Sequence, residues 1–455
     1  MAWLSSPLTA FEQDLLPAAK QKALAILEAA LEAVDPVRAV KRAMHLHGDS
    51  LDVGPASYNL AAYEHIYVLG AGKASAAMAQ ALEEMLGERI TAGWINVKDG
   101  YTAPTRRITI HEAGHPVPDE RSVAGSKQIA SYAQAAGPQD LVFCLISGGG
   151  SALMTLPVEG ISLADMGQLT QDLLRSGATI NEVNAIRKHL SQLKGGRLSQ
   201  LAQPAQVVSL ILSDVIGNPL DVIASGPTSP DSTTFAQAAG ILRNYGLLGK
   251  VPSAIAQHLK RGMEGTIAET PKAADKSFER TQNLIIASNE HAAQAALDMA
   301  CDLGMNGLLL STYVEGEARE VGKVFGAIAR EMTVSGHPIP RPACIVAGGE
   351  TTVTVRGGGM GGRSQELALA AAPAVAGLDD VAVIGLGTDG TDGPTDAAGG
   401  VVTGHTVRRA AEKQQSLGAA LLQNDAYHFF EALGDLIITG PTNTNVNDLI
   451  LVFAF

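Results

Sequence analysis

The sequence predicts an α/β fold made of two α/β domains, the first with a Rossmann-like, doubly wound parallel sheet. The chain has 455 residues, which is long for one core, and 46% of them are hydrophobic, enough to fill two cores. Short runs that are apolar throughout, typical of buried parallel strands, alternate with segments of helical periodicity. This alternation predicts a parallel sheet that binds ligands outside the carboxyl ends of its strands.

The N-terminal part begins with helices and then alternates. Residues 8–46 have an apolar stripe at helical spacing and predict helices, with Pro36 opening a new turn. Ser162 and Asp165 have the spacing of a capping box. Strands are predicted at 66–69, 92–97, 141–146 and 207–212, and helices at 74–86, 162–175 and 180–193.

A polar stretch over residues 266–280, which contains Pro271, joins two units, and we place the domain boundary near residue 250. The predicted domains are therefore residues 1–250 and 251–455. Residues 351–355 alternate Thr and Val, which predicts a half-buried strand. Further strands are predicted at 283–287, 308–312, 343–347, 381–386, 436–439 and 449–453.

Composition and charge exclude several classes of protein. A net charge of −13 and an aromatic content of 4% argue against nucleic-acid or anionic-membrane partners, so any phosphate must bind at a local site. The three cysteines are scattered, and their spacing fits neither a disulfide framework nor a zinc site. Residues 1–20 lack a leader pattern, and no run reaches the ~18 apolar residues of a membrane span. We expect a cytoplasmic protein, and the sequence leaves a homo-oligomer open.

Five glycine-rich loops, each after a short apolar run, predict a phosphate-handling cleft. A strand that ends in glycine and small hydroxyl residues exposes backbone N–H groups that suit an anion. Two of the loops carry a cation, Lys73 and Arg363, and another carries paired aspartates. The loops cover residues 70–73, 147–151, 348–350, 357–363 and 388–393.

The first two loops each admit two interpretations. The loop with Lys73 resembles a dinucleotide fingerprint, but Ser75 stands where the third glycine belongs, and the spacing does not fit a P-loop. A lysine at a helix start opposes the helix dipole, so it indicates a bound anion, or else a solvated turn. Residues 147–151 predict an oxyanion or phosphate nest, with a nucleophile elbow as the alternative.

Carboxylates and a helix face complete the candidate residues. Asp214 ends a buried strand, where a catalytic base or a metal-linked carboxylate would lie, or a helix cap. Asn184 and Lys188 share one helix face, which either lines a cleft or is solvated. Arg363 suits a bidentate oxyanion clamp. Asp389, Asp392 and Asp396 predict a Mg²⁺ site, unless they only form Asp-Gly turns.

Together the loops resemble the glycerate 2-kinase family, the two-domain type whose C-terminal part is called the MOFRL domain. The matching stretches are residues 68–74, 146–153, 212–215, 224–228, 347–353, 361–366, 387–393 and 442–448. The resemblance implies a mixed sheet in the second domain, an active-site cleft between the domains, and transfer of the γ-phosphoryl of ATP to the 2-hydroxyl of D-glycerate with Mg²⁺. The alternative is an NAD(P)H-dependent hydroxypyruvate reductase, a label often given to members, although Ser75 argues against a dinucleotide site.

The resemblance also implies catalytic roles for Lys73 and Arg363, which fall in different predicted domains and which we expect to contribute little to the core. The chemistry requires a group that accepts the hydroxyl proton, for which Asp214 and Asp389 are the candidates. Asp389 and Asp392 are the predicted metal ligands. The predicted nucleotide-binding residues are Gly70, Gly72, Ser147, Gly148, Gly149, Gly150, Ser151, Asn184, Lys188, Glu350, Thr351, Asn443 and Asn445.

Overall fold

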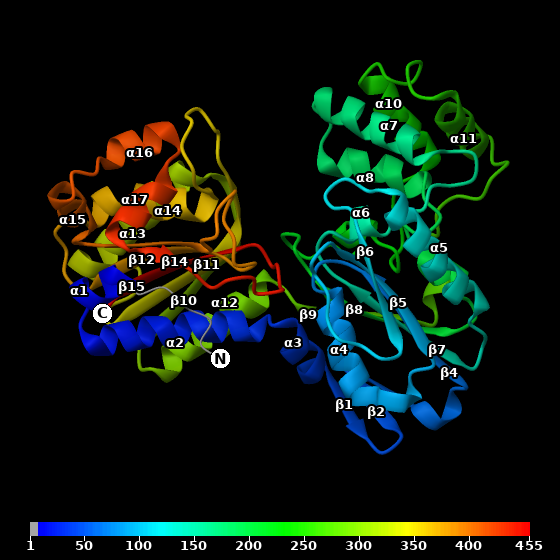
Figure 1. Ribbon diagram of the computed structural model, residues 1–455, viewed down its shortest axis with the longest axis horizontal. Coiled ribbons are helices and arrows are strands. Elements are labelled where there is room, and N and C mark those ends of the chain that lie inside the picture. The colour runs from blue at the N-terminus through cyan, green and yellow to red at the C-terminus, as the bar shows by residue number, and fades with distance from the viewer. Residues whose placement is uncertain (1–7) are drawn as a thin grey trace. The chain divides into compact units, whose positions relative to one another are not determined.

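The structure, a computed structural model, describes residues 8–455 and divides into two compact units (Figure 1). One unit is residues 36–286; the other joins the N-terminal segment up to Asp35 to residues 287–455. The division falls at residues 286 and 287 rather than near 250, because the helix at Ser253–Met263 buries Ile255 and Leu259 in the core of the first unit. The expectation about a leader concerns in part residues 1–7, which lie outside the described residues.

The unit of residues 36–286 is built on a six-stranded sheet in the order β6-β5-β4-β7-β8-β9. Pairing is parallel from β6 through β8, as expected for a doubly wound sheet. The strands are β4 (His65–Ala71), β5 (Ala92–Lys98), β6 (Ile108–Ala113), β7 (Asp140–Ile146), β8 (Gln206–Leu212) and β9 (Thr281–Ala287). Strand β6 was not predicted, because Thr109, His111 and Glu112 are polar and no residue between Ile108 and Ala113 is fully buried.

Helices cover this sheet and extend beyond it. The capping box of Ser162 and Asp165 is confirmed at the start of α7. Helix α8 ends at His189, four residues short of the prediction. The helices are α3 (Pro36–Ala43), α4 (Ser75–Leu86), α5 (Glu120–Ala135), α6 (Gly150–Leu153), α7 (Leu163–Arg175), α8 (Ile180–His189), α9 (Arg197–Leu201), α10 (Phe235–Asn244) and α11 (Ser253–Met263).

A small antiparallel sheet corrects the prediction that residues up to 46 are helical. It consists of β1 (Met44–His47), β2 (Ser50–Val53) and β3 (Ala56–Asn59). Two-residue turns connect these strands, and Gly48 and Gly54 adopt φ of 62° and 55° there, which glycine allows at little cost.

The other unit contains a mixed sheet in the order β10-β11-β15-β12-β13-β14. Only β10 and β11 pair in parallel among the pairs with a defined register. The strands are β10 (Asn306–Glu317), β11 (Ala343–Thr352), β12 (Val381–Gly387), β13 (Gly399–Thr403), β14 (Leu436–Ile437) and β15 (Asp448–Ala454). The separate strand predicted at 351–355 is wrong: Thr351 and Thr352 end β11, and Val355 is exposed in irregular chain.

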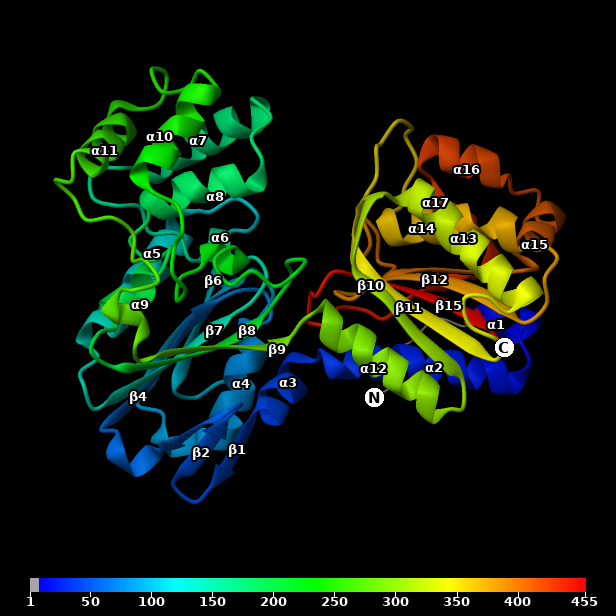
Figure 2. The ribbon, with the colours of Figure 1, turned by 180° about the vertical axis from the view of Figure 1, so that it is seen from behind.

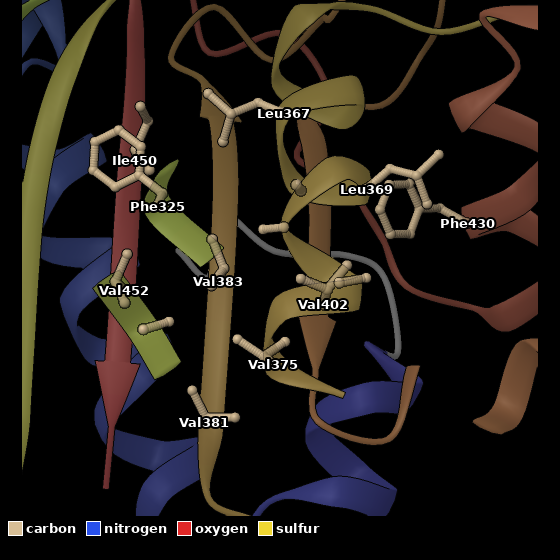
Figure 3. Packing of buried hydrophobic residues seen from close by; sticks show 14 of the residues in the cluster. Phe325, Leu367, Leu369, Val375, Val381, Val383, Val402, Phe430, Ile450 and Val452 are labelled. Atoms are coloured by element: carbon tan, nitrogen blue, oxygen red, sulfur yellow. The ribbon is translucent and has the colours of Figure 1, made fainter. Parts of the chain in front are cut away.

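Helices on this sheet bury a continuous apolar core. Figure 3 shows Leu367 above the strand that carries Val381 and Val383, whereas Leu369 of the same helix lies beside Phe430. Figure 2 shows helix α2 lying along α12, which places residues 17–33 in this unit. The helices are α1 (Thr9–Asp14), α2 (Pro17–Ala33), α12 (Asn289–Asp302), α13 (Ala318–Ser335), α14 (Arg363–Val375), α15 (Thr406–Glu412), α16 (Leu417–Gln423) and α17 (Ala426–Leu433).

Within residues 8–455 no helix combines the length and the apolar character that crossing a membrane requires.

Candidate active site

The first two glycine-rich loops meet because they follow neighbouring parallel strands, β4 and β7. The Lys73 backbone N–H donates to the Gly148 carbonyl at 2.9 Å. A Cβ on Gly70 would lie 2.0 Å from the Leu145 carbonyl oxygen, and one on Gly72 would lie 2.0 Å from Ser147 Oγ. These two glycines therefore let the strand ends pack together, and they are buried in that contact.

Ser147 and Ser75 connect this packed region to α4. Ser147 is fully buried, and its Oγ accepts a hydrogen bond from the Ala74 N–H at 3.0 Å and lies 3.0 Å from Ser75 Oγ. Ser75 Oγ donates to the Leu145 carbonyl at 3.1 Å. The serine that replaces the third glycine of a dinucleotide fingerprint thus links the helix to β7, and Ser147 points inward.

Three polar side chains surround the outer part of the second loop. A Cβ on Gly149, whose φ is 85°, would lie 2.9 Å from His115 Nε2 and 3.6 Å from Lys73 Cγ. A Cβ on Gly148 would lie 2.4 Å from Asp214 Oδ2. Burial and the nearby charge of Lys73 lower the pKa of His115 to about 4, so this imidazole is neutral at pH 7. The structure therefore brings the predicted Lys73 and Asp214 to one glycine loop.

The two candidate residues of helix α8, Asn184 and Lys188, are buried and bonded to neighbouring side chains of the same unit. Lys188 is only 3% exposed, and its Nζ lies 3.1 Å from Asp221 and 3.4 Å from Asp231. Its charge is therefore balanced inside the unit, and the solvated-face alternative does not hold for it. Asn184 is buried and accepts a hydrogen bond from Ser225, whose Oγ lies 2.5 Å from Ser151 Oγ.

In the other unit Arg363 begins α14 and is held by two carboxylates. Its Nη1 donates to Glu350 at 2.6 Å, its Nη2 donates to Asp448 at 3.1 Å, and its Nε lies 2.5 Å from Asp448 Oδ2. Burial raises the pKa of Asp448 to about 7 against the Arg363 charge. Burial acts to lower the pKa of Arg363, but the two carboxylates raise it above its ordinary value. Arg363, whose side chain is 31% exposed, thus belongs to a partly buried cluster of charges in which only Asp448 is buried.

The three predicted metal-binding aspartates point to different partners. Both carboxylate oxygens of Asp392 accept backbone N–H groups of α14, from Ser364 at 3.1 Å and Gln365 at 2.8 Å, and burial raises its pKa to about 6. Asp389 Oδ1 accepts from the N–H and the hydroxyl of Thr391. Asp396 accepts from the Tyr427 hydroxyl at 2.8 Å. No three His, Cys, Asp or Glu side chains of residues 8–455 form a group that would hold a metal ion.

A pocket of about 640 Å³ collects most of the predicted residues of this unit. Its lining includes Thr351, Arg363, Asp389, Asn445 and Asp448. Asn443 is exposed with a φ of 57° and does not line it.

Several residues of these sites were not predicted from the sequence. Asp448 directly precedes the apolar run of β15, and a charge at the start of a buried strand is a signal that could have identified it. His115 lies in a Pro-rich turn that does not by itself indicate a site. Lys194 lines a pocket beside Gly149 and Ser151, and its sequence pattern does not distinguish it from a surface cation. Arg187, which lies beside the helix face of Asn184 and Lys188 and could line a cleft, lines the same pocket.

Two family models match successive parts of the chain. Residues 22–260 match a domain of unknown function, DUF4147, and residues 343–448 match the MOFRL family. A glycerate 2-kinase of Pyrococcus horikoshii is 42% identical, over 94% of this chain and 96% of its own length. The chain belongs to the glycerate 2-kinase family. The resemblance predicted from the glycine-rich loops is therefore confirmed.

Further relatives and a solved structure of this family support the assignment. The D-glycerate 2-kinase of Thermotoga maritima is 41% identical over 95% of this chain and 97% of its own length. The crystal structure of glycerate kinase from the same organism matches with a TM-score of 0.86 and 39% identity, covering 96% of this chain and 99% of that one. An Agrobacterium vitis relative with a hydroxypyruvate reductase name is 43% identical over 84% of this chain and 85% of its own length. The predicted fold class of two α/β domains is confirmed.

Proposed function

We propose that this protein is a glycerate 2-kinase that transfers the γ-phosphoryl group of ATP to the 2-hydroxyl of D-glycerate, giving 2-phosphoglycerate and ADP. The observation that carries the proposal is the likeness to glycerate 2-kinases along nearly the whole chain. We expect it to act in the cytoplasm on small molecules, without a nucleic-acid or membrane partner.

Phosphoryl transfer requires mainly positioning and neutralisation of charge, and each unit supplies a cation for this. Among residues 8–455 Lys73 forms no ion pair, and the imidazole beside it is neutral. Its ammonium group is therefore available to a substrate anion. Backbone N–H groups of the adjoining glycine loop add donors for a phosphate oxygen.

Arg363 is oriented before substrate binds. The buried Asp448 fixes its Nε and Nη2 atoms, whereas Nη1 meets Glu350, whose side chain is 45% exposed. A substrate oxyanion can replace the exposed carboxylate at Nη1 without disturbing the buried pair. Arg363 then stabilises negative charge in a fixed geometry, which is the usual source of electrostatic catalysis. Glu350 is thus the carboxylate that the substrate would replace, and Thr351 is the residue that follows it in the chain.

Two carboxylates remain candidates for accepting the hydroxyl proton. Asp214 lies against Gly148 of the phosphate loop, and Asp389 lines the pocket that contains Arg363. Asp214 thus lies at the glycine loop that also contacts Lys73, and Asp389 lies in the same pocket as Arg363. Asp214→Asn and Asp389→Asn distinguish them, because loss of the base lowers kcat, whereas loss of a metal ligand is partly restored by more Mg²⁺.

Mg²⁺ in kinases is held by one or two carboxylates together with substrate phosphates, so the absence of a protein cage within residues 8–455 fits this ion. The hydrogen bonds of Asp389 in the described chain use Oδ1, which leaves Oδ2 for the metal. Both oxygens of Asp392 hold the start of α14. We therefore place Mg²⁺ on Asp389 and give Asp392 the role of positioning Arg363. When bound, the ion neutralises the β- and γ-phosphates.

The test is an assay of the purified protein with ATP, Mg²⁺ and D-glycerate, in which ADP and 2-phosphoglycerate are quantified. Hydroxypyruvate with NADH serves as the parallel assay for the reductase alternative. Formation of ADP and 2-phosphoglycerate supports the kinase. NADH oxidation without any ADP formation would overturn it.

A further inference from the structure

A pocket in the unit of residues 36–286 contains two cations that no carboxylate of residues 8–455 balances. It measures about 470 Å³ and lies between the turn at residues 115–118, the segment 149–155 and helices α7 and α8. Lys194 is 3% exposed, and its Nζ donates to the Ser151 carbonyl. Arg187 is half-buried and donates to Thr170 Oγ1 at 3.3 Å. In the described chain neither Arg187 nor Lys194 forms an ion pair.

Lys188 shows how this fold treats a lysine whose role is structural. It is as buried as Lys194 and directly follows Arg187, yet Asp221 and Asp231 both reach its ammonium group. Burial of a charge without a partner is costly. Burial and the repulsion of Arg187 lower the pKa of Lys194 to about 7. Lys194 therefore gives up its proton readily near neutral pH, and an anionic ligand beside Arg187 and Lys194 would restore and compensate the positive charge of the pocket.

The walls of the pocket indicate what kind of anion binds. Leu163, Met166 and Leu174 of α7 line one side, and Val117 lies on the turn opposite. Val117 is 74% exposed and Leu174 is 58% exposed, so both present apolar surface to a ligand. Glycerate has only three carbons, each bearing oxygen, and it would leave these walls uncovered. A nucleotide has an aromatic base for the apolar walls and phosphates for the cations, and its size suits a pocket in this range.

We propose that this pocket is the nucleotide subsite, with the base against the α7 wall and the phosphates on Arg187 and Lys194. The inference rests on the proposed kinase function, which requires a nucleotide. Gly149 lines the pocket and also lies beside Lys73. The phosphate chain therefore runs from Arg187 and Lys194 towards the glycine loop and Lys73.

The experiment measures binding of a non-hydrolysable ATP analogue with Mg²⁺ to the full chain by calorimetry. Lys194→Met and Arg187→Met are each expected to weaken the analogue by roughly 10- to 100-fold, the scale for losing a hydrogen bond to a charged group. D-glycerate affinity is expected to stay unchanged. Lys127→Met is the matched control, since it removes the same charge from an exposed position of the same unit.

Two further measurements separate a ligand-binding role from a structural one. Thermal melts are expected to show Lys194→Met at least as stable as wild type, because the variant loses an unbalanced buried charge. Leu174→Asp is expected to weaken the ATP analogue but not tripolyphosphate, which has no base. If Lys194→Met does not fold, Arg187→Met and Lys194→Arg give the same test, with binding lost in the former and retained in the latter.

Unchanged analogue affinity in both Arg187→Met and Lys194→Met would overturn the inference, as would a loss confined to D-glycerate. Equal weakening of tripolyphosphate and the analogue by Leu174→Asp would overturn the placement of the base. If wild type binds the analogue through these residues but forms no 2-phosphoglycerate, the proposed function fails and the nucleotide subsite stands. If wild type forms 2-phosphoglycerate while Arg187→Met and Lys194→Met bind the analogue with wild-type affinity, the proposed function stands and the nucleotide subsite fails.

Discussion

In the Arg363→Ala variant, the free energy of unfolding is expected to keep falling as pH rises above 7. In the wild-type protein, the pH dependence that Asp448 causes ends near pH 7. Asp448 is 8% exposed, and burial raises its pKa from 3.8 to about 7. An acid whose folded pKa exceeds its unfolded value binds more protons in the folded state between the two values. Stability therefore falls with pH across that window, which in wild type ends near pH 7.

Without Arg363 the pKa of Asp448 rises further, because the opposing positive charge is gone. The window then extends above pH 7, and within it the free energy of unfolding falls by about 1.4 kcal/mol per pH unit. Between pH 7 and pH 9 the variant is therefore expected to lose about 2–3 kcal/mol relative to wild type. The lost packing of the Arg363 stem adds an offset that does not depend on pH.

The assay is urea unfolding of wild type and Arg363→Ala, followed by circular dichroism at several pH values between 6 and 9. Asp448→Asn and the double variant are the controls, because they remove the titrating carboxyl. Their difference is expected to stay nearly constant with pH, and any remaining slope belongs to Asp392, which also senses the Arg363 charge. A constant difference between Arg363→Ala and wild type across this range would refute the reasoning.

Three other predictions follow from the two sites. Lys73→Ala is expected to lower kcat/KM by about 10²-fold and to leave Tm unchanged. Steady-state kinetics and a thermal melt of the variant measure the two quantities. A kcat/KM equal to that of wild type would exclude Lys73 from the mechanism. Asp389→Asn is expected to raise the Mg²⁺ concentration for half-maximal activity by about tenfold, with Asp396→Asn as the control from the same loop; identical Mg²⁺ titrations would remove Asp389 from the metal site. Gly72→Ala is expected to lower the free energy of unfolding by about 2–3 kcal/mol, because the added Cβ would lie 2.0 Å from Ser147 Oγ. Unfolding in denaturant measures this difference. A loss below about 0.5 kcal/mol would contradict the packing argument.

Much of the fold could be predicted from local patterns. The fully apolar runs identified β7, β8, β12 and β15, because a strand buried on both faces must be apolar along its length. The strand β6 escaped the same rule, since a partly exposed strand carries polar residues. Membership of the N-terminal helices in the C-terminal unit could not be predicted, because an amphipathic helix does not specify which core it covers.

The candidate site divides in the same way. The glycine-rich loops, Lys73, Arg363 and Asp214 were found in the sequence, because glycine and a charged residue at a strand end carry a local physical signature. The roles of Asp392 and Ser147 could not be predicted from the sequence, because their hydrogen-bond partners come from other elements. Asp392 was predicted to hold a metal, whereas the structure assigns both of its oxygens to the first turn of α14.

The sequence by itself determined the fully apolar strands, the glycine-rich loops and the family. Tertiary structure alone decided which charges are balanced. Lys188 and Lys194 lie six positions apart and are equally buried. In the part of the chain that the structure describes, only Lys188 of the two meets carboxylates, those of Asp221 and Asp231, 33 and 43 residues further along. Local periodicity reports which side chains are buried, but the electrostatic balance of a buried charge depends on distant segments that only the folded chain brings together.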